Sequence, residues 1–141
     1  MEISFKVFNE LPSEAKQIRS EVFEIEQGFV DEFDEDDNDA LHIVMYKDGT
    51  AIGTSRVIFS KTHNSICIGR FAIIKSERNK GLGRKLLERT EQEIIKKYGH
   101  ILVGLSSQER ASNFYFKCGY KFTEERYLDQ YCPHVWMIKK L

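Results

Sequence analysis

The chain is organised around the stretch Arg78-Asn79-Lys80-Gly81-Leu82-Gly83. An apolar run, residues 66–74, precedes this stretch, and a long amphipathic segment, residues 84–98, follows it. This order predicts a strand, then a basic glycine-containing turn, then the first turn of a helix. Glycines let the backbone approach a ligand closely, and the unpaired N–H groups of a helix start attract an anion. A purely structural glycine turn is the alternative, so the ligand hypothesis depends on the rest of the chain.

Composition predicts one globular domain that covers residues 1–141. The chain has 141 residues, of which 41% are hydrophobic and 30% charged. No apolar run approaches the roughly 20 residues of a membrane-spanning helix, and the first residues lack a signal pattern. We therefore expect a cytoplasmic protein with no membrane partner. The three cysteines form no C-x-x-C pair and the four histidines are scattered, so neither a disulfide framework nor a metal site is expected.

Residues 31–39 carry seven acidic side chains and no basic one, which leaves the remainder of the chain net basic. The spacing does not fit an EF-hand loop: counted from Asp34, the sixth position is Asp39 and the twelfth is Met45. We expect a solvated loop, with recognition of a cationic substrate as the alternative. The mildly basic remainder suits a small anionic ligand. It is far from the basic surface of a nucleic-acid-binding protein, so no such partner is expected.

Hydrophobic periodicity and turn signals predict the element order β-α-β-β-β-α-β-α-β-β. The Asp48-Gly49 pair is a strong hairpin signal, so the central strands should form an antiparallel meander. The continuous apolar run 101–105 follows a helix and should lie parallel to a neighbouring strand. The expected fold class is α+β, with a central mixed, mostly antiparallel twisted sheet flanked by helices. The expected strands are residues 2–8, 41–46, 51–59, 65–74, 101–105, 120–127 and 135–139, and the helices residues 12–28, 83–98 and 110–118.

Neither the Rossmann motif G-x-G-x-x-G nor the P-loop motif occurs. Instead, the chain resembles the GNAT superfamily of N-acetyltransferases. Residues 70–73 (Arg-Phe-Ala-Ile) and the stretch 78–83 are similar to that family's strand and R/Q-x-x-G-x-G/A pyrophosphate loop. Residues 111–120 (Ala-Ser-Asn-Phe-Tyr-Phe-Lys-Cys-Gly-Tyr) are similar to its A-x-x-[LF]-Y-x-x-x-G-[FY] helix and turn. Residues 22–27 and 133–137 resemble the small bacterial ElaA/YjcF-type group, so the resemblance spans nearly the whole chain.

The resemblance implies that acetyl-CoA is the acyl donor. Its pyrophosphate is expected on the N–H groups of residues 78–83, and its pantetheine arm along the strand at residues 71–73. In this family that strand splays from its parallel neighbour, and the freed backbone groups pair with the ligand. At Gln108 many members carry Asn, so this amide is longer than usual. The expected donor-binding residues are Phe71, Ala72, Ile73, Arg78, Asn79, Lys80, Gly81, Leu82, Gly83, Arg84, Gln108 and Asn113.

Tyr115 is the expected catalytic acid. When an amine attacks the thioester, a phenol near the sulfur can hydrogen-bond the departing thiolate. The alternative is that Tyr115 only packs with Phe114 and Phe116. Histidine is the side chain best suited to exchange a proton near neutral pH, and His134 is the candidate base or substrate ligand. A structural histidine, with a water chain as the base, is the alternative at this position.

The expected function is transfer of an acetyl group from acetyl-CoA to a primary amine by direct attack in a ternary complex. Glu26 and Gln27 are the candidate substrate contacts. An acyl-cysteine intermediate at Cys118 or Cys132 is disfavoured, because the sequence places no histidine base near Cys118 and buried cysteines are common. A non-catalytic acyl-CoA-binding regulatory module is the alternative function. The sequence names the acceptor only as a small-molecule or peptide amine, and it leaves open whether the protein forms a homodimer.

Overall fold

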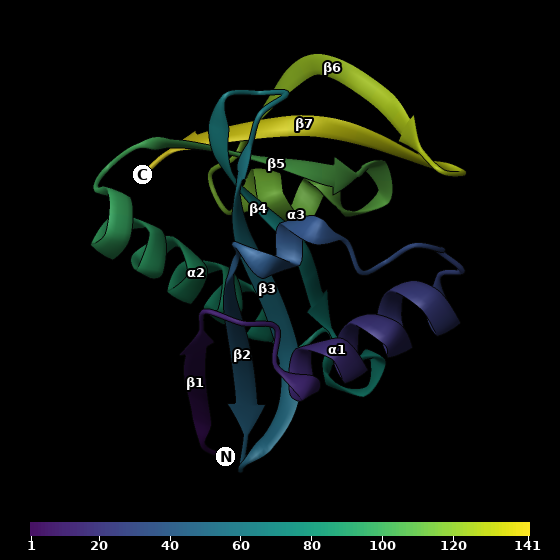
Figure 1. Cartoon of the computed structure of the whole chain (residues 1–141), viewed down its shortest axis with the longest axis vertical. Coiled ribbons are helices and arrows are strands. Elements are labelled where there is room, and N and C mark those ends of the chain that lie inside the picture. Colours follow the sequence, from purple (N-terminus) through teal and green to yellow (C-terminus); the bar gives the residue numbers. More distant parts are fainter.

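The computed structural model describes all residues, 1–141, and its centre is a seven-stranded sheet. The strand order is β1-β2-β3-β4-β5-β7-β6, and only β4 and β5 are parallel. Strands β1 to β4 run along the long axis of the molecule while β5, β7 and β6 cross it, which shows the twist of the sheet (Figure 1). The predicted mixed, mostly antiparallel sheet is confirmed. The strands are β1 (Ile3–Phe8), β2 (Leu41–Lys47), β3 (Thr50–Ser60), β4 (Ser65–Ile73), β5 (Leu102–Gln108), β6 (Lys121–Asp129) and β7 (Cys132–Lys140).

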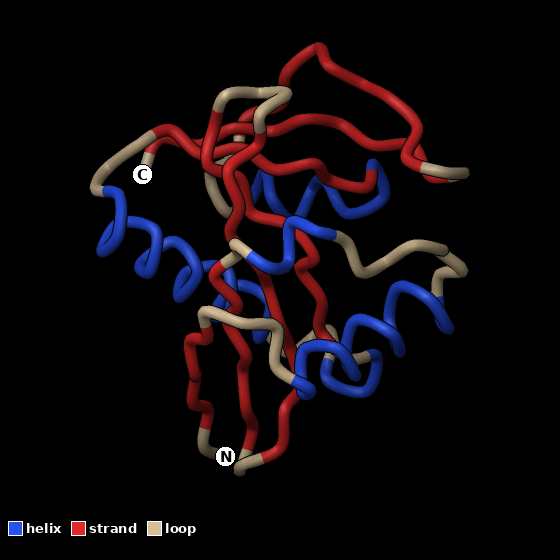
Figure 2. The backbone as a smooth tube through the Cα atoms, viewed as in Figure 1, coloured by secondary structure: helices blue, strands red, loops and turns tan.

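Three α-helices flank this sheet (Figure 2). The predicted first helix is present, but it changes its winding, because α1 continues directly into the π-helical segment η1. None of the helices is long and apolar enough to cross a membrane. The helices are α1 (Ser13–Arg19), α2 (Leu82–Tyr98) and α3 (Ser112–Lys117), and the short segments are η1 (Ser20–Glu26), η2 (Glu35–Asn38), η3 (Lys75–Glu77) and η4 (Glu109–Ala111).

Helices α1 and α2 lie on opposite faces of the sheet. Successive side chains of a strand point to opposite sides, so alternate residues of β2 pack towards α2 and towards α1. On β2, Ile43 and Met45 belong to the main core together with the buried residues of α2. The alternate residues Val44 and Tyr46 pack against Ala15 of α1. The sheet therefore has an α2 face, which holds the main core, and an α1 face, which is less completely covered.

Two features of the sheet differ from the simple chain order. Strand β7 lies between β5 and β6, so the last strand of the chain is inside the sheet and β6 is at its edge. Strand β5 also runs to Gln108, three residues beyond its predicted end, because Gln108 pairs with His134 of β7. This extension brings the end of β5 alongside the residues that were expected to take part in catalysis.

Candidate functional site

Strands β4 and β5 separate soon after they begin to pair. Their parallel pairing covers only Ile66 to Ile68 of β4. Beyond Ile68, β4 keeps its partner β3, while β5 continues along β7. A register shift between β3 and β4, together with left-handed backbone at Arg70 (φ 46°), marks the place where β4 turns away. The expected splay is confirmed, and residues 69–73 have no strand partner on the side that faces β5.

A cavity of about 1050 Å³ passes through this gap. On the α2 face it is lined by the turn before α2 and by Phe114 and Tyr115 of α3, which pack against the main core. On the α1 face it is lined by His134 and Trp136 of β7, whose neighbours along the strand point into the main core. The cavity therefore connects the two faces of the sheet, with the expected donor turn on one face and His134 on the other.

The turn before α2 leaves the start of that helix uncapped. Gly81 is the N-cap residue, with a φ of 77°, and no side chain caps the first N–H groups. Asn79 is also left-handed (φ 65°), a conformation that asparagine and glycine tolerate best. Residues 81–84 line the cavity. The free N–H groups and the dipole of this 17-residue helix make a suitable site for an anion.

Arg78 is already paired. Its two terminal nitrogens donate to the carboxylate of Glu26 at 2.6 and 2.8 Å, and its Nε donates to the carbonyl of Ile73 at 2.9 Å. The hydrogen bonds from Arg78 lower the pKa of Glu26. Arg78 lines the cavity but Glu26 does not. This ion pair joins a predicted substrate residue to a predicted donor residue, and it ties the end of η1 to the turn.

The other basic side chains of the turn differ in position. Lys80 does not line the cavity, and its Nζ lies 3.1 Å from the carboxylate of Glu77. Arg84 is exposed and lines the cavity. Gly83 serves the packing of α2 against α3, because an added Cβ would lie 3.3 Å from Cζ of Phe114. Arg84 is paired too, since its Nε lies 3.3 Å from the carboxylate of Glu88, so the N–H groups of the turn are the unpaired donors at this end of the cavity.

The predicted pantetheine strand presents two side chains to the cavity. Phe71 and Ile73 line it, whereas Ala72 is buried on the α1 face, next to Ile18 and Val22 of the α1–η1 segment. The ring of Phe71 also packs against the ring of Tyr115, with centroids 5.9 Å apart. The backbone of this segment is the part without a strand partner, which is the feature that backbone recognition of a ligand requires.

The two predicted amide contacts differ in their surroundings. Gln108 lines the cavity, but its Nε2 donates to Oε1 of Gln27 at 2.8 Å and its Oε1 accepts from Nε of Arg110 at 2.8 Å. Gln27 also lines the cavity, so this predicted substrate residue contacts a predicted donor residue directly. Asn113 is exposed on α3 and does not line the cavity. The roles of these residues stay predictions.

Tyr115 has features of both alternatives considered for it, because it packs with other aromatic rings and also lines the cavity. Its ring packs edge-on against Phe114 and Tyr120, with centroids 5.0 and 6.0 Å apart. Its side chain also lines the cavity. Burial raises the pKa of Tyr115 well above its usual value. At neutral pH the side chain is therefore a neutral phenol that can donate a hydrogen bond into the cavity.

His134 is 6% exposed and lines the cavity from β7. Its Nδ1 lies 2.9 Å from the carbonyl oxygen of Cys132, an acceptor, which assigns the proton to Nδ1. Its Nε2 then carries a free lone pair and has no partner in the protein. The ring of Tyr127 stacks on the imidazole, with centroids 6.1 Å apart. The hydrogen bond at Nδ1 and the stacked ring therefore fix the orientation of an imidazole that lines the cavity.

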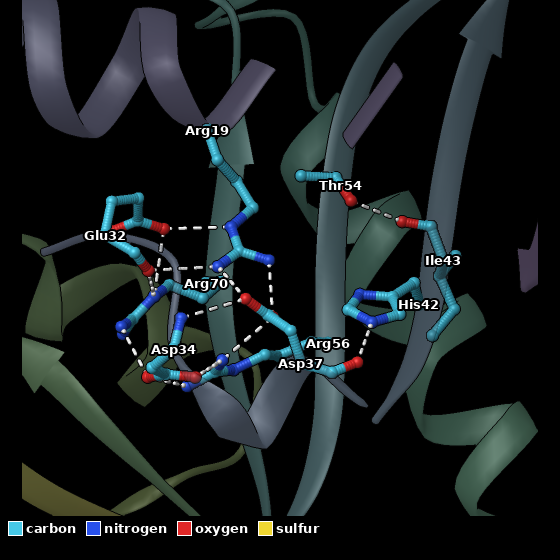
Figure 3. Close-up of polar contacts among 9 residues, drawn as sticks. All are labelled: Arg19, Glu32, Asp34, Asp37, His42, Ile43, Thr54, Arg56 and Arg70. Carbon is cyan, nitrogen blue, oxygen red and sulfur yellow. Dashed lines mark hydrogen bonds and ion pairs between the residues drawn. The ribbon is translucent and has the colours of Figure 1, made fainter. Parts of the chain in front are cut away.

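The acidic segment, residues 31–39, differs most clearly from its prediction as a solvated loop. It is not simply a solvated loop, because Glu32 and Asp37 are only 5% and 4% exposed. Figure 3 shows three arginines and three carboxylates gathered between α1 and the strands. We call these six residues the arginine–carboxylate cluster; they are Arg19, Arg56, Arg70, Glu32, Asp34 and Asp37.

Asp37 lies at the centre of this cluster. Its carboxylate is 2.7 Å from Nη1 of Arg19 and 2.9 Å from Nη1 of Arg56. Burial works to raise the pKa of Asp37, but the hydrogen bonds and charges of the two arginines outweigh it and lower that pKa to about 2. For Glu32, burial prevails over the nearby arginines and raises the pKa. The arginines could not be predicted as partners of the acidic segment, because they lie outside it, on α1, β3 and β4.

The cysteines are poorly suited to nucleophilic chemistry. Cys67 lines the cavity, but burial raises the pKa of its thiol to about 12. Burial also raises the pKa of the Cys118 and Cys132 thiols. Because the thiolate is the nucleophilic form, all three side chains are predominantly inert thiols at neutral pH.

Comparison with known proteins agrees with this geometry. Residues 11–141 match the family described as "Acetyltransferase (GNAT) domain". A Bacillus subtilis relative named "Putative acetyltransferase BSU40680" is 38% identical over 132 residues, which cover 89% of this chain and 87% of the relative. The crystal structure of Escherichia coli ElaA superposes with a TM-score of 0.86 at 25% identity, covering 99% of this chain and 100% of ElaA. An acyl-CoA N-acyltransferase from Pseudomonas aeruginosa gives a TM-score of 0.85 at 26% identity, covering 98% and 99% of the two chains.

The family match covers most of the chain, and the split sheet, the uncapped glycine turn and the aromatic helix α3 correspond to the motifs that carried the resemblance. The predicted resemblance and fold class are therefore confirmed. The chain belongs to the GNAT acetyltransferase family, the acyl-CoA N-acyltransferases whose acyl donor is acetyl-CoA.

Proposed function

We propose that the protein transfers the acetyl group of acetyl-CoA to a primary amine by direct attack in a ternary complex. The observation that carries this proposal is the cavity through the β4–β5 gap. It leads from an uncapped helix start on the α2 face to an oriented histidine on the α1 face. Donor and amine can therefore enter from opposite faces and meet in the gap between the strands.

The donor end of the cavity fits acetyl-CoA. The N–H groups of residues 81–84 and the side chain of Arg84 suit the pyrophosphate. The free edge of β4 at residues 69–73 suits the amides of the pantetheine arm, which would pair with it as an added strand does. For Gln108 to contact this arm, its amide has to leave Gln27 or Arg110.

Two side chains suit the transfer itself. In the reaction a C–N bond forms, the thioester C–S bond breaks, and the amine loses a proton. Nε2 of His134 is positioned to accept this proton. Tyr115 donates a hydrogen bond to the departing thiolate, and its raised pKa keeps the proton on the phenol, because a thiolate (pKa about 8.5) is a weaker base than the phenolate. Direct attack is favoured over an acyl-cysteine route because burial keeps the cysteines protonated.

The test is CoA release from acetyl-CoA in the presence of an amine panel, measured with His134→Ala and Tyr115→Phe. We expect His134→Ala to lower kcat by about a hundredfold and Tyr115→Phe by at least tenfold, in the range of general acid–base effects. Acetyl-CoA affinity, measured by calorimetry, should change little in both. His100→Ala and Tyr98→Phe, at exposed positions, are the matched controls and should keep full activity. Tight acetyl-CoA binding without turnover of any amine would instead indicate a non-catalytic acyl-CoA-binding module.

A further inference from the structure

On the α1 face the cavity extends beyond His134 into a groove that the proposed reaction does not use. The floor of this groove includes small residues, namely Cys67 and Gly69 of β4 and Ser106 of β5. One wall is the inner face of the edge strand β6. We call this region the acceptor groove; its walls are Glu125, Tyr127 and Asp129 of β6, Trp136 of β7, Asp36 of η2 and His63 of the β3–β4 turn.

Trp136 provides an aromatic surface in the acceptor groove. Its indole packs directly against Gly104, where an added Cβ would lie 2.0 Å from Cζ2. The imidazole of His63 stacks on the indole, with ring centroids 3.5 Å apart and an interplanar angle of 5°. His63 is held by Glu125 at 2.8 Å and by Ser60 at 3.3 Å. The imidazole of His63, a planar group that can accept a proton, therefore lies between the indole of Trp136 and the carboxylate of Glu125.

The acceptor groove is acidic. Asp36, Glu125 and Asp129 line it, and none of them is paired with a lysine or an arginine. Two arginines, Arg56 and Arg70, also line the cavity, but carboxylates of the arginine–carboxylate cluster neutralise both. The charge left over is negative, which attracts a cationic ligand.

His134 gives a second and independent indication that a ligand binds here. Its side chain is 6% exposed and lines the cavity, and its hydrogen bond within the protein is made by Nδ1, which leaves Nε2 unpaired. Because this nitrogen is left unpaired on a largely buried side chain that lines the cavity, it is available to accept a hydrogen bond from a donor group on a ligand. An amine nitrogen supplies such a donor.

We infer that the acceptor is an amine that carries a second positive charge, with the reacting nitrogen at His134 and the second cation at Glu125. This inference rests on the proposed function. Trp136 lies two positions along β7 from His134, roughly 7 Å away, and its indole carries the imidazole that Glu125 holds. About four or five carbons between two nitrogens span this distance. The second ammonium replaces His63 as the partner of Glu125 and lies against the indole of Trp136, which gives it an ion pair and a cation–π contact.

The test compares acceptors at saturating acetyl-CoA. The assay is CoA release with 1,4-diaminobutane, 1,5-diaminopentane, the monoamines butylamine and pentylamine, and the zwitterion 4-aminobutanoate. We expect kcat/KM for the diamines to exceed that for the monoamines by about tenfold or more, the effect of one charge-assisted contact. Glu125→Gln should remove most of this preference, because it should raise KM for the diamines several times more than KM for the monoamines. Glu124→Gln is the matched control, because Glu124 is the exposed neighbour that does not line the cavity, and it should change neither class.

The outcomes separate this inference from the proposed function. Equal kcat/KM for diamines and monoamines, with no effect of Glu125→Gln, would overturn the inference and leave the acetyltransferase proposal standing. Preference for 4-aminobutanoate would overturn it too, since it would show that Arg56 or Arg70 selects an anionic acceptor. No CoA release with any amine, from protein that binds acetyl-CoA in calorimetry, would overturn the proposed function and the inference with it.

Discussion

Replacing Asp37 by Asn tests whether the acidic segment is part of the folded core. The Asp37 carboxylate accepts hydrogen bonds from Arg19 at 2.7 and 3.0 Å, from Arg56 at 2.9 Å and from the backbone N–H of Asp34 at 3.3 Å. Removing one partner of a buried ion pair typically costs about 3–5 kcal/mol. Because Arg19 keeps Glu32 and Arg56 keeps Asp34, we expect the lower end of that range, about 3 kcal/mol.

Urea unfolding followed by circular dichroism measures this loss. With a slope of about 1–3 kcal/mol per molar urea, the midpoint should fall by roughly 1–3 M. Asp39→Asn is the matched control, because Asp39 belongs to the same segment but is exposed and forms no ion pair. We expect its unfolding free energy to change by less than about 0.5 kcal/mol. Equal small losses in the two variants would refute the structural role of the cluster.

A comparison of wild type with Asp37→Asn at different pH values gives a second test, in which the sign of the stability change is defined. The pKa of Asp37 is about 2 in the folded protein, below the value of about 3.9 for an unfolded chain. Its stabilisation is therefore complete above about pH 4 and is lost as the pH falls towards 2, a difference of about 2–3 kcal/mol. The gap in unfolding free energy between wild type and Asp37→Asn should narrow by that amount between about pH 6 and about pH 2. A gap that does not depend on pH would contradict the ion-pair description.

Three glycine substitutions test the cavity. Gly104→Ala should displace the Trp136 indole, lower the unfolding free energy by about 1–3 kcal/mol and change the tryptophan fluorescence. In contrast, Gly69→Ala should be tolerated, since its Cβ would meet Arg56 only at 3.9 Å, and equal effects of the two would contradict the packing described for Trp136. Gly81→Val places a β-branched residue at a φ of 77°, so calorimetry should show acetyl-CoA affinity falling at least tenfold, and unchanged affinity would contradict the donor assignment.

Most of the secondary-structure elements could be predicted from the local pattern of hydrophobic and turn-forming residues. The alternation in β1 to β4, the Asp48-Gly49 turn and the glycine turn before α2 are determined by neighbouring residues, so their positions could be predicted. The resemblance added the splay between β4 and β5, which no single segment encodes. The position of β7 between β5 and β6 depends on pairing between distant strands, and hydrophobic pattern alone does not specify it.

Residues that a single sequence motif identifies could be predicted to lie at the candidate site. Features that combine residues from several segments were not predicted. Tyr115 and His134 both line the cavity, as expected of reacting groups. The burial of Asp37 could not be predicted, because its partners Arg19 and Arg56 lie 18 and 19 residues away on other elements. A run of acidic residues looks solvated in isolation, and only arginines at otherwise buried positions of α1 and β3 signal the alternative. The acceptor groove likewise combines residues from six separate segments.

The most direct test of the central claim is a single-turnover experiment with excess protein and acetyl-labelled acetyl-CoA. The label is followed with and without an acceptor amine. This amine is 1,4-diaminobutane or another member of the panel that the protein acetylates. Direct attack across the β4–β5 gap predicts that free CoA and acetylated amine appear together, at the same rate, and only when the amine is present. Free CoA before the amine is added, with the label bound to the protein, would contradict direct attack. Binding of acetyl-CoA without transfer to any amine would contradict the proposed enzyme activity.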